Sequence, residues 1–548
     1  TSTFLAAVLA TVAATQGGAT SPVPQEQEAV DYGTMALPGQ PPQATVVQTW
    51  STGYLVEVVF FDTPSGFVEK TLVYVPLDSI ALGPRPMLVV FHQYGKNHFD
   101  AFDNTSLIEE CRQRGWFCVA PLGAAKKTYA SVASQLNVEH VVDCAANVFW
   151  PWVDRRRVYG IGFSMGAGDC ATFAARHQDP YHPIFAGLVL HTGNHDKTWV
   201  WDTEPAVQDI LDFWFGGSPT QFPFEYAQAS TVKLNPTTGA FVSGLHQGRN
   251  LEYIATRTFY AQDDSLPFLQ TSALGLHDYL SVFSGVASLD VSTDDHSALP
   301  NTHSWDTLDQ KDALDFLSSK VLTMPPTGHQ VMDRSGQAWW FDVHQSATGA
   351  FSTFTWVVNR TTNVVAFRDT KNVEWASLPY HLVGFAPGPL TIYTKSVDGS
   401  DDEFRLDGFA AAPSSVVVNG VAALAGVDYE YDAAIKRLTI HGGPVLDKWV
   451  VTPWIPPAPP AAERAVPRRA PTRRHVRVVS VGGRGDARSP GRCGPRTVRS
   501  SRRCRDRCVA NASSPEVLAR GPRHVLPRMR APTASMGTAL PRAKLRPE

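Results

Sequence analysis

The residue with the clearest capacity for chemistry is a serine in the pentapeptide Gly162-Phe163-Ser164-Met165-Gly166, which matches the pattern G-x-S-x-G. A buried strand is predicted before it (157–163) and a helix after it (164–177). A sharp strand-to-helix turn exposes the hydroxyl group, and the helix start offers a positive dipole and free N–H groups to a developing oxyanion. We therefore expect Ser164 to be a nucleophile; the alternative is an ordinary serine at the end of a buried strand.

A serine hydroxyl is a weak nucleophile that needs a base, and the base needs an acid to orient it. His303 directly precedes the last predicted helix of the domain and is the preferred base, with His296 as the alternative. Two adjacent acids, Asp263 and Asp264, follow a late predicted strand (254–261). Asp264 is preferred because Asp-Ser-Leu-Pro is similar to the Asp-x-x-Val-Pro ending common at this position, and Asp263 remains open.

The segment Phe91-His92-Gln93-Tyr94-Gly95 ends an apolar run that predicts a strand buried on both faces. Backbone N–H groups here would lie where an oxyanion loop is expected. Tyr94 and Met165 are the preferred oxyanion donors, and Gln93 is the second candidate because it replaces the first glycine of the common His-Gly-x-Gly form. The alternative is that His92 only caps the strand.

Further side chains are candidates for lining a substrate pocket. His191 and His195 end the strand that follows the nucleophile helix, and Trp199 and Trp201 come shortly after. We expect Gln93, His191 and Trp199 to bind substrate, although aromatic core packing explains the tryptophans equally well. No metal and no cofactor is expected. The chain contains no CxxC motif, which argues against a zinc or redox role.

The order of elements predicts two folded domains. Strands alternate with helices of 10–15 residues over 45–322, which indicates βαβ units and a mainly parallel, doubly wound α/β sheet. Over 323–453 the pattern changes to short strands with turns at Asn-Gly, Asp-Gly and Gly-Gly. That second pattern predicts a small all-β domain, most simply a sandwich.

Residues of about 50–322 resemble the secreted esterases of the α/β-hydrolase superfamily, a group that includes polyhydroxybutyrate depolymerases, feruloyl esterases and acetylxylan esterases. The resemblance is carried by VVFHQYGKN, YGIGFSMGAG, YAQDDSLP and THSW. It implies the α/β-hydrolase fold, ester hydrolysis and a triad of Ser164, Asp264 and His303. It also implies that an attached β-domain such as 323–453 can serve polymer binding.

The two ends of the chain differ from its body. The apolar run 4–14 has the length of a signal-peptide core, so we expect residues 1–20 to be a truncated secretory signal and 21–44 a linker. Segment 463–548 carries 22 of the 48 Lys and Arg but five of the 51 Asp and Glu. We expect 454–548 to be a disordered Pro/Arg-rich tail, and its GC-rich codons suggest a frame-shifted translation; an intact mass of the mature protein tests this.

The acidic body excludes nucleic acid as a partner, since phosphate binding needs Lys and Arg. We expect a secreted monomer that acts on an ester, small or polymeric, with no membrane partner. A local disulfide between Cys111 and Cys118 is conceivable in an exported chain. Two functional alternatives remain: a peptidase of the prolyl-oligopeptidase type, which usually carries a β-propeller ahead of its hydrolase domain, and a binding protein that has lost catalysis.

Overall fold

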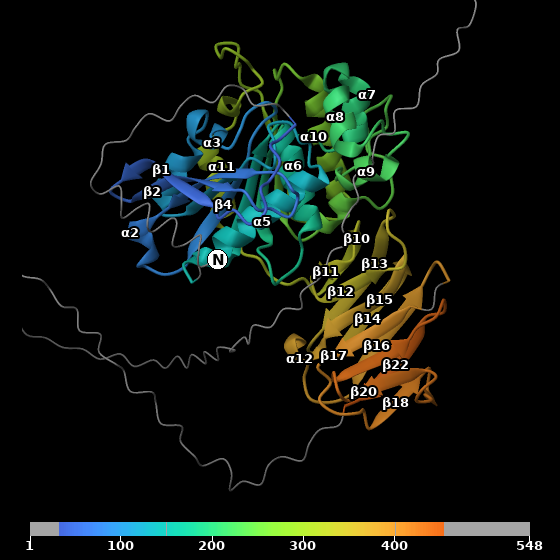
Figure 1. Cartoon of the computed structure of the whole chain (residues 1–548). Helices are drawn as coiled ribbons and strands as arrows, with labels where there is room; N and C mark the ends of the chain where they lie inside the picture. Colours follow the sequence, from blue (N-terminus) through green and yellow to red (C-terminus); the bar gives the residue numbers. More distant parts are fainter. Residues whose placement is uncertain (1–31, 150, 400–401, 454–548) are drawn as a thin grey trace, which may run out of the picture. The chain divides into compact units, whose positions relative to one another are not determined.

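A computed structural model describes residues 32–149, 151–399 and 402–453 (Figure 1). The predicted signal peptide, residues 21–31 of the predicted linker and the basic tail lie outside the described residues. The last part of that linker is paired with the α/β domain. Met35 forms a β-bridge with Phe67, and the Ala36 N–H donates to the Gly66 carbonyl. Pairing therefore begins before the predicted boundary at residue 45.

The α/β domain is built on a nine-stranded sheet with the strand order β1-β2-β3-β5-β4-β6-β7-β8-β9. β1, β2, β3 and β5 pair antiparallel in turn, whereas every pair from β5 through β9 is parallel. The strands are β1 (Gln43–Trp50), β2 (Gly53–Phe60), β3 (Glu69–Val75), β4 (Arg85–Phe91), β5 (Phe117–Pro121), β6 (Val153–Phe163), β7 (Phe185–His191), β8 (Ala255–Ala261) and β9 (Ala287–Ser292).

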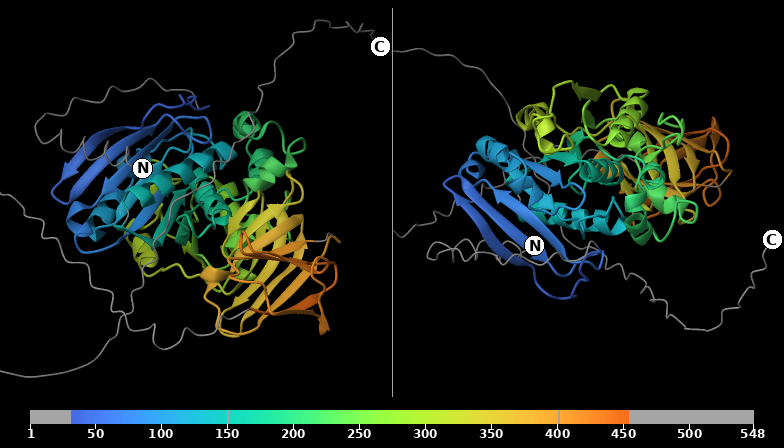
Figure 2. Two further views of the ribbon diagram at one scale, coloured as in Figure 1. Left: turned by 60° about the horizontal axis from the view of Figure 1, so that its bottom comes forward. Right: turned by 90° about the horizontal axis from the view of Figure 1, so that it is seen from above.

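Helices connect the strands and lie on both faces of this sheet (Figures 1 and 2). The α-helices are α2 (Leu77–Ile80), α3 (Asp100–Asp103), α4 (Leu107–Arg114), α5 (Val132–Val148), α6 (Met165–Arg176), α7 (Lys197–Thr203), α8 (Gln208–Phe215), α9 (Pro223–Gln228), α10 (Pro267–Ser281) and α11 (Gln310–Ser318). Three 3₁₀ turns add η1 (Pro205–Val207), η2 (Gln247–Leu251) and η3 (Trp305–Thr307).

Successive side chains of β4 enter two different cores. Met87 and Val89 belong to the core cluster that includes side chains of α5 and α6, whereas Leu88 and Val90 belong to the cluster that includes side chains of α4 and α11. All four are buried. A strand covered on both faces must be apolar at every position, which is why this segment is a continuous apolar run and not an alternating one. This double covering holds the carboxyl ends of the parallel strands in place.

Two further sheets form the C-terminal part. Their orders are β10-β13-β14-β16-β22-β18-β19 and β11-β12-β15-β17-β21-β20. The elements are β10 (Thr327–Met332), β11 (Gly336–Ala338), β12 (Phe341–Gln345), β13 (Ser352–Asn359), β14 (Val364–Lys371), β15 (Val373–Pro379), α12 (Tyr380–Val383), β16 (Leu390–Ser396), β17 (Glu403–Asp407), β18 (Ser415–Val418), β19 (Val421–Ala422), β20 (Tyr429–Asp432), β21 (Arg437–His441) and β22 (Asp447–Thr452).

The two C-terminal sheets face each other across an aromatic core, and Figure 2 shows them as two layers coloured yellow to orange. Phe341 of one sheet contacts Phe354 and Phe367 of the other at ring-centroid distances of 6.2 and 5.2 Å. All three side chains are buried. Inward-facing side chains from both sheets that share one core define a sandwich. The predicted all-β sandwich is confirmed.

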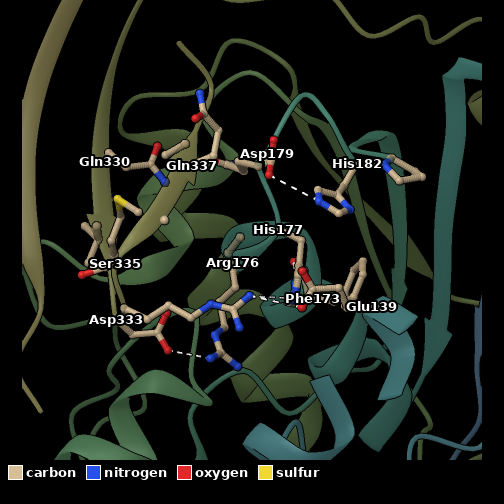
Figure 3. Close-up of a pocket in the computed structure, with 18 of the residues that line it drawn as sticks. Glu139, Phe173, Arg176, His177, Asp179, His182, Gln330, Asp333, Ser335 and Gln337 are labelled. Carbon is tan, nitrogen blue, oxygen red and sulfur yellow. Dashed lines mark hydrogen bonds and ion pairs between the residues drawn. The ribbon is translucent and has the colours of Figure 1, made fainter. Parts of the chain in front are cut away.

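Between the end of α6 and the strands β10 and β11 lies a polar cavity of about 240 Å³ (Figure 3). Arg176 and Asp333 form a buried ion pair beside it, 2.6 Å between nitrogen and oxygen. Asn250 of the α/β domain also contacts β10, since its side-chain amide donates to the Val331 carbonyl and its side-chain oxygen accepts the Val331 N–H. The lining includes neither Ser164 nor His303, so this cavity is separate from the candidate catalytic residues.

The cysteines that the structure describes are all free thiols. Cys111 on α4 and Cys118 on β5 are both buried in one core, and no disulfide joins them. The bridge considered from their spacing is therefore absent from the structure. Within the described residues, no helix is long and apolar enough to cross a bilayer.

Candidate active site

Ser164 lies at the sharp turn between β6 and α6. Its backbone has φ 57° and ψ −119°, a left-handed conformation that is unfavourable for a residue with a Cβ. The Ser164 N–H donates to the His191 carbonyl at 2.9 Å, which ties the turn to β7. Such strain persists only where the surrounding structure holds it, and it is typical of functional positions.

Glycines make this turn sterically feasible. A Cβ on Gly162 would lie 2.2 Å from the Gly166 carbonyl oxygen, and a Cβ on Gly166 would lie 2.3 Å from the Phe91 carbonyl oxygen. Both contacts are with backbone, which cannot rotate away. The pattern G-x-S-x-G is therefore required here because the helix start passes directly over β6 and β4.

His303 and Asp264 form a buried pair. Nδ1 of His303 lies 3.0 and 2.9 Å from the two carboxylate oxygens of Asp264. Asp264 follows β8, its side chain is 0% exposed, and it also accepts the N–H of Leu266 at 2.8 Å. A carboxylate that accepts the Nδ1 proton leaves Nε2 of His303 free to act as a base.

The His303 ring lies against the nucleophile turn. Its centroid is 4.5 Å from that of Phe163, the residue before Ser164. Phe163 also contacts Trp305 at 5.2 Å, and Trp305 donates to the buried carboxylate of Asp100 at 3.0 Å. The side chains around Phe163 thus hold the histidine loop next to the residue that bears the hydroxyl group.

The alternative acid and the alternative base pair with each other. His296 bonds to Asp263 through Nδ1 at 2.8 Å and through its backbone N–H at 2.7 Å. The Asp263 side chain is 32% exposed, and the described ring contacts of the Phe163 side chain do not include His296. The four candidate residues therefore form two His–Asp pairs, and of these only the pair of His303 and Asp264 is packed against the elbow.

Two backbone N–H groups remain available for an oxyanion. Met165 is the first residue of α6, where N–H groups have no partner inside the helix. Among the described residues, no atom accepts a hydrogen bond from the N–H of Met165 or of Tyr94. The Gln93 N–H instead donates to Asp100 at 3.2 Å. Gln93 is therefore excluded as a backbone donor in this conformation, which leaves Tyr94 and Met165.

The three residues expected to bind substrate have different surroundings. His191 is fully buried, with its ring 4.4 Å from Phe163 and its Nε2 2.9 Å from the Thr307 hydroxyl. Burial lowers the pKa of His191 well below 6.5. This placement differs from the expectation, because His191 packs beneath the elbow in the core. Trp199 is also buried, whereas Gln93 is partly exposed.

Sequence reasoning missed a buried charged group behind the nucleophile helix. Lys197 is fully buried, and its Nζ donates to the carbonyl and side-chain oxygens of Asn194 at 2.7 and 2.5 Å. Nζ lies 4.0 Å from Asp169 on α6. Burial lowers the pKa of Lys197 to about 8 and raises that of Asp169 to about 6. In the sequence, only the segment HTGNHDK (191–197) at the end of β7, which carries many polar residues for a buried position, indicated this network.

A second missed feature is an apolar cluster over the nucleophile. Met165 packs with buried residues of the segments 129–130, 200–215 and 226–229 and with the partly buried ring of Tyr94. Helices α7, α8 and α9 supply most of these side chains. The cluster brings both candidate oxyanion donors against apolar surface, where hydrogen bonds to a developing charge are stronger than in water.

The strand order and the positions of the candidate residues define one fold. The nucleophile follows β6, the acid follows β8, and the histidine follows β9, all at the carboxyl ends of parallel strands. This part of the chain has the α/β-hydrolase fold. The fold prediction is confirmed. Among the described residues, no group of His, Cys, Asp and Glu could hold a metal ion in this α/β-hydrolase domain or in the sandwich.

No protein-family model and no curated protein matches the chain. Similar solved structures include FphF, a fluorophosphonate-binding serine hydrolase of Staphylococcus aureus, with 16% identity, 49% of this chain and 100% of that chain covered, and a TM-score of 0.36. The match to an S-formylglutathione hydrolase from Agrobacterium tumefaciens has 13% identity and a TM-score of 0.37, and it covers 50% of this chain and 99% of that chain. The match to a ferulic acid esterase has 13% identity and a TM-score of 0.35, and it covers 48% of this chain and 98% of that chain. The roles of residues in this chain therefore rest on its own geometry.

Proposed function

We propose that the chain is a serine hydrolase that cleaves carboxylic esters through an acyl-enzyme on Ser164. The observation that carries the proposal is the buried pair of His303 and Asp264 packed against Phe163, the residue before the strained serine. A base held in one tautomer by a buried acid, beside a serine at a strained strand-to-helix turn, is the constellation that activates serine.

The reaction follows from these positions. Nε2 of His303 takes the proton of the Ser164 hydroxyl as its oxygen attacks the ester carbonyl carbon. The N–H groups of Tyr94 and Met165 stabilise the resulting oxyanion. The intermediate collapses, His303 gives its proton to the departing alkoxide, and an alcohol leaves. Water then attacks the acyl-enzyme with His303 as base, which releases the acid and restores Ser164.

A turnover assay tests the proposal. The full chain should hydrolyse p-nitrophenyl acetate and butyrate, and Ser164→Ala should reduce kcat by at least about 10⁴-fold while the thermal unfolding curve stays unchanged. Turnover retained by Ser164→Ala contradicts the proposal. Proline-containing p-nitroanilides form a second arm: cleavage of these in preference to esters would identify a peptidase instead.

The finer substrate class and the location belong to the same proposal. The motif resemblance supports an exported enzyme acting on polymeric or plant-cell-wall-type esters or polyesters. A panel of feruloylated and acetylated xylan, polyhydroxybutyrate and short esters ranks the substrates by kcat/KM. Preference for short esters with no release from any polymer would overturn the polymer assignment. Detection of the protein in cell pellets only would overturn export.

A further inference from the structure

The loop that follows β5, residues 122–131, has an unusual backbone. Ala124, Tyr129 and Ala130 have φ values of 73°, 49° and 60°. Residues with a Cβ rarely adopt this left-handed conformation, and three of them within seven positions require a framework that holds them. The loop therefore needs an anchor within the fold.

Glu69, the first residue of β3, supplies that anchor. Its side chain is fully buried, and its Oε1 accepts the N–H groups of Leu122 and Gly123 at 2.7 and 3.1 Å. Its Oε2 accepts the N–H of Ala124 at 2.8 Å and the side-chain amide of Asn137 at 3.0 Å. A buried carboxylate with four N–H donors holds the start of the loop in a single conformation.

The same loop contacts the segment that carries the candidate oxyanion donor on both sides of Tyr94. Nε2 of His92 lies 2.8 Å from the Leu122 carbonyl, and the Gly95 N–H donates to the Lys126 carbonyl at 3.0 Å. The Tyr129 ring packs on the Tyr94 ring at 5.6 Å. The Tyr94 backbone is thus flanked by contacts with the loop that Glu69 fixes.

We propose that Glu69 is a positioning residue for the oxyanion hole: by holding residues 122–124 it fixes the loop that sets the direction of the Tyr94 N–H. The inference rests on the proposed function, because the Tyr94 N–H matters only if an oxyanion forms. Hydrogen bonds to an oxyanion act mainly in the transition state, so their weakening lowers kcat and leaves KM nearly unchanged.

Glu69→Gln tests the inference. Glutamine offers one acceptor oxygen and one amide donor, so at least one loop N–H loses its acceptor. We expect kcat for p-nitrophenyl acetate to fall by about 10–100-fold with KM within about twofold of wild type. Rates are expressed per active site by burst titration, because a purely structural role lowers the number of active sites and not kcat per site.

Glu139→Gln is the matched control, since Glu139 pairs with His177 and Arg334 beside the polar cavity. It should keep kcat within about twofold. If Glu69→Gln does not fold, Tyr129→Leu takes its place, because it removes the contact with the Tyr94 ring and keeps the anchor. An unchanged kcat per active site in the folded variant overturns the inference, whereas turnover retained by Ser164→Ala overturns the proposed function instead.

Discussion

Nδ1 of His303 lies 2.9 Å from a carboxylate oxygen of Asp264, while the neighbouring Asp263 pairs with His296 at 2.8 Å. Two adjacent acids therefore point to two different histidines. Because His303 packs against Phe163 and His296 does not, the chain contains both a candidate catalytic pair and a matched pair of the same chemistry a few residues away.

This duplication gives a controlled test of the acid. Asp264→Asn should lower kcat by about 10³–10⁴-fold, because an amide no longer holds the His303 ring in the required tautomer. Asp263→Asn should stay within about threefold of wild type. Steady-state kinetics on p-nitrophenyl butyrate compare the two variants, and equal losses in both would refute the assignment of Asp264.

The elbow predicts a position-specific steric effect. Gly162→Ala places a methyl group 2.2 Å from the Gly166 carbonyl oxygen, so the turn must shift. We expect a loss of about 1–3 kcal/mol in the free energy of unfolding, together with nearly complete loss of turnover. Gly285→Ala is the control, since a Cβ there meets open space. Urea unfolding and ester turnover measure both, and a fully active Gly162→Ala would contradict the geometry.

Buried histidines predict acid sensitivity. Burial lowers the pKa values of His177, His191 and His195, the last two well below 6.5. The folded state therefore binds fewer protons than the unfolded state, so this stability is present above pH 6.5 and is lost as the pH falls. Each group contributes a slope of up to about 1.4 kcal/mol per pH unit below that point.

Urea unfolding between pH 7.5 and 5 measures this slope in wild type and in His195→Leu. His195 is fully buried, and among the described residues neither of its ring nitrogens has a hydrogen-bond partner. The substitution should reduce the slope of the unfolding free energy against pH by up to about 1.4 kcal/mol per pH unit, which corresponds to one proton. A slope that is identical in the two proteins would show that His195 takes up its proton equally in the folded and the unfolded state, and would contradict the prediction.

The sequence was sufficient to predict the elements whose signals are local. The strand, the pentapeptide around Ser164 and the helix are contiguous, and the chain order of acid and histidine follows from the fold. The alternation of elements likewise predicted a parallel sheet, and the turn-rich segment a sandwich.

Features that depend on distant contacts were not predictable in this way. The backbone N–H groups that donate to Glu69 lie more than 50 residues further along the chain. His191, at the carboxyl end of β7, fits a pocket and a core equally well, and only its packing on Phe163 decides. The parallel pairing of β14 with β16 also cannot be read from short strands, because β15 belongs to the other sheet.

The most direct test of the central claim is covalent labelling of the nucleophile. The full chain is incubated with an activated phosphonate ester, digested and analysed by peptide mass spectrometry. We predict one phosphonyl group per molecule on Ser164, with loss of ester turnover in proportion to labelling and no adduct in Ser164→Ala. An adduct on another residue that accompanies the loss of turnover, or full turnover by a protein labelled at Ser164, would contradict the account.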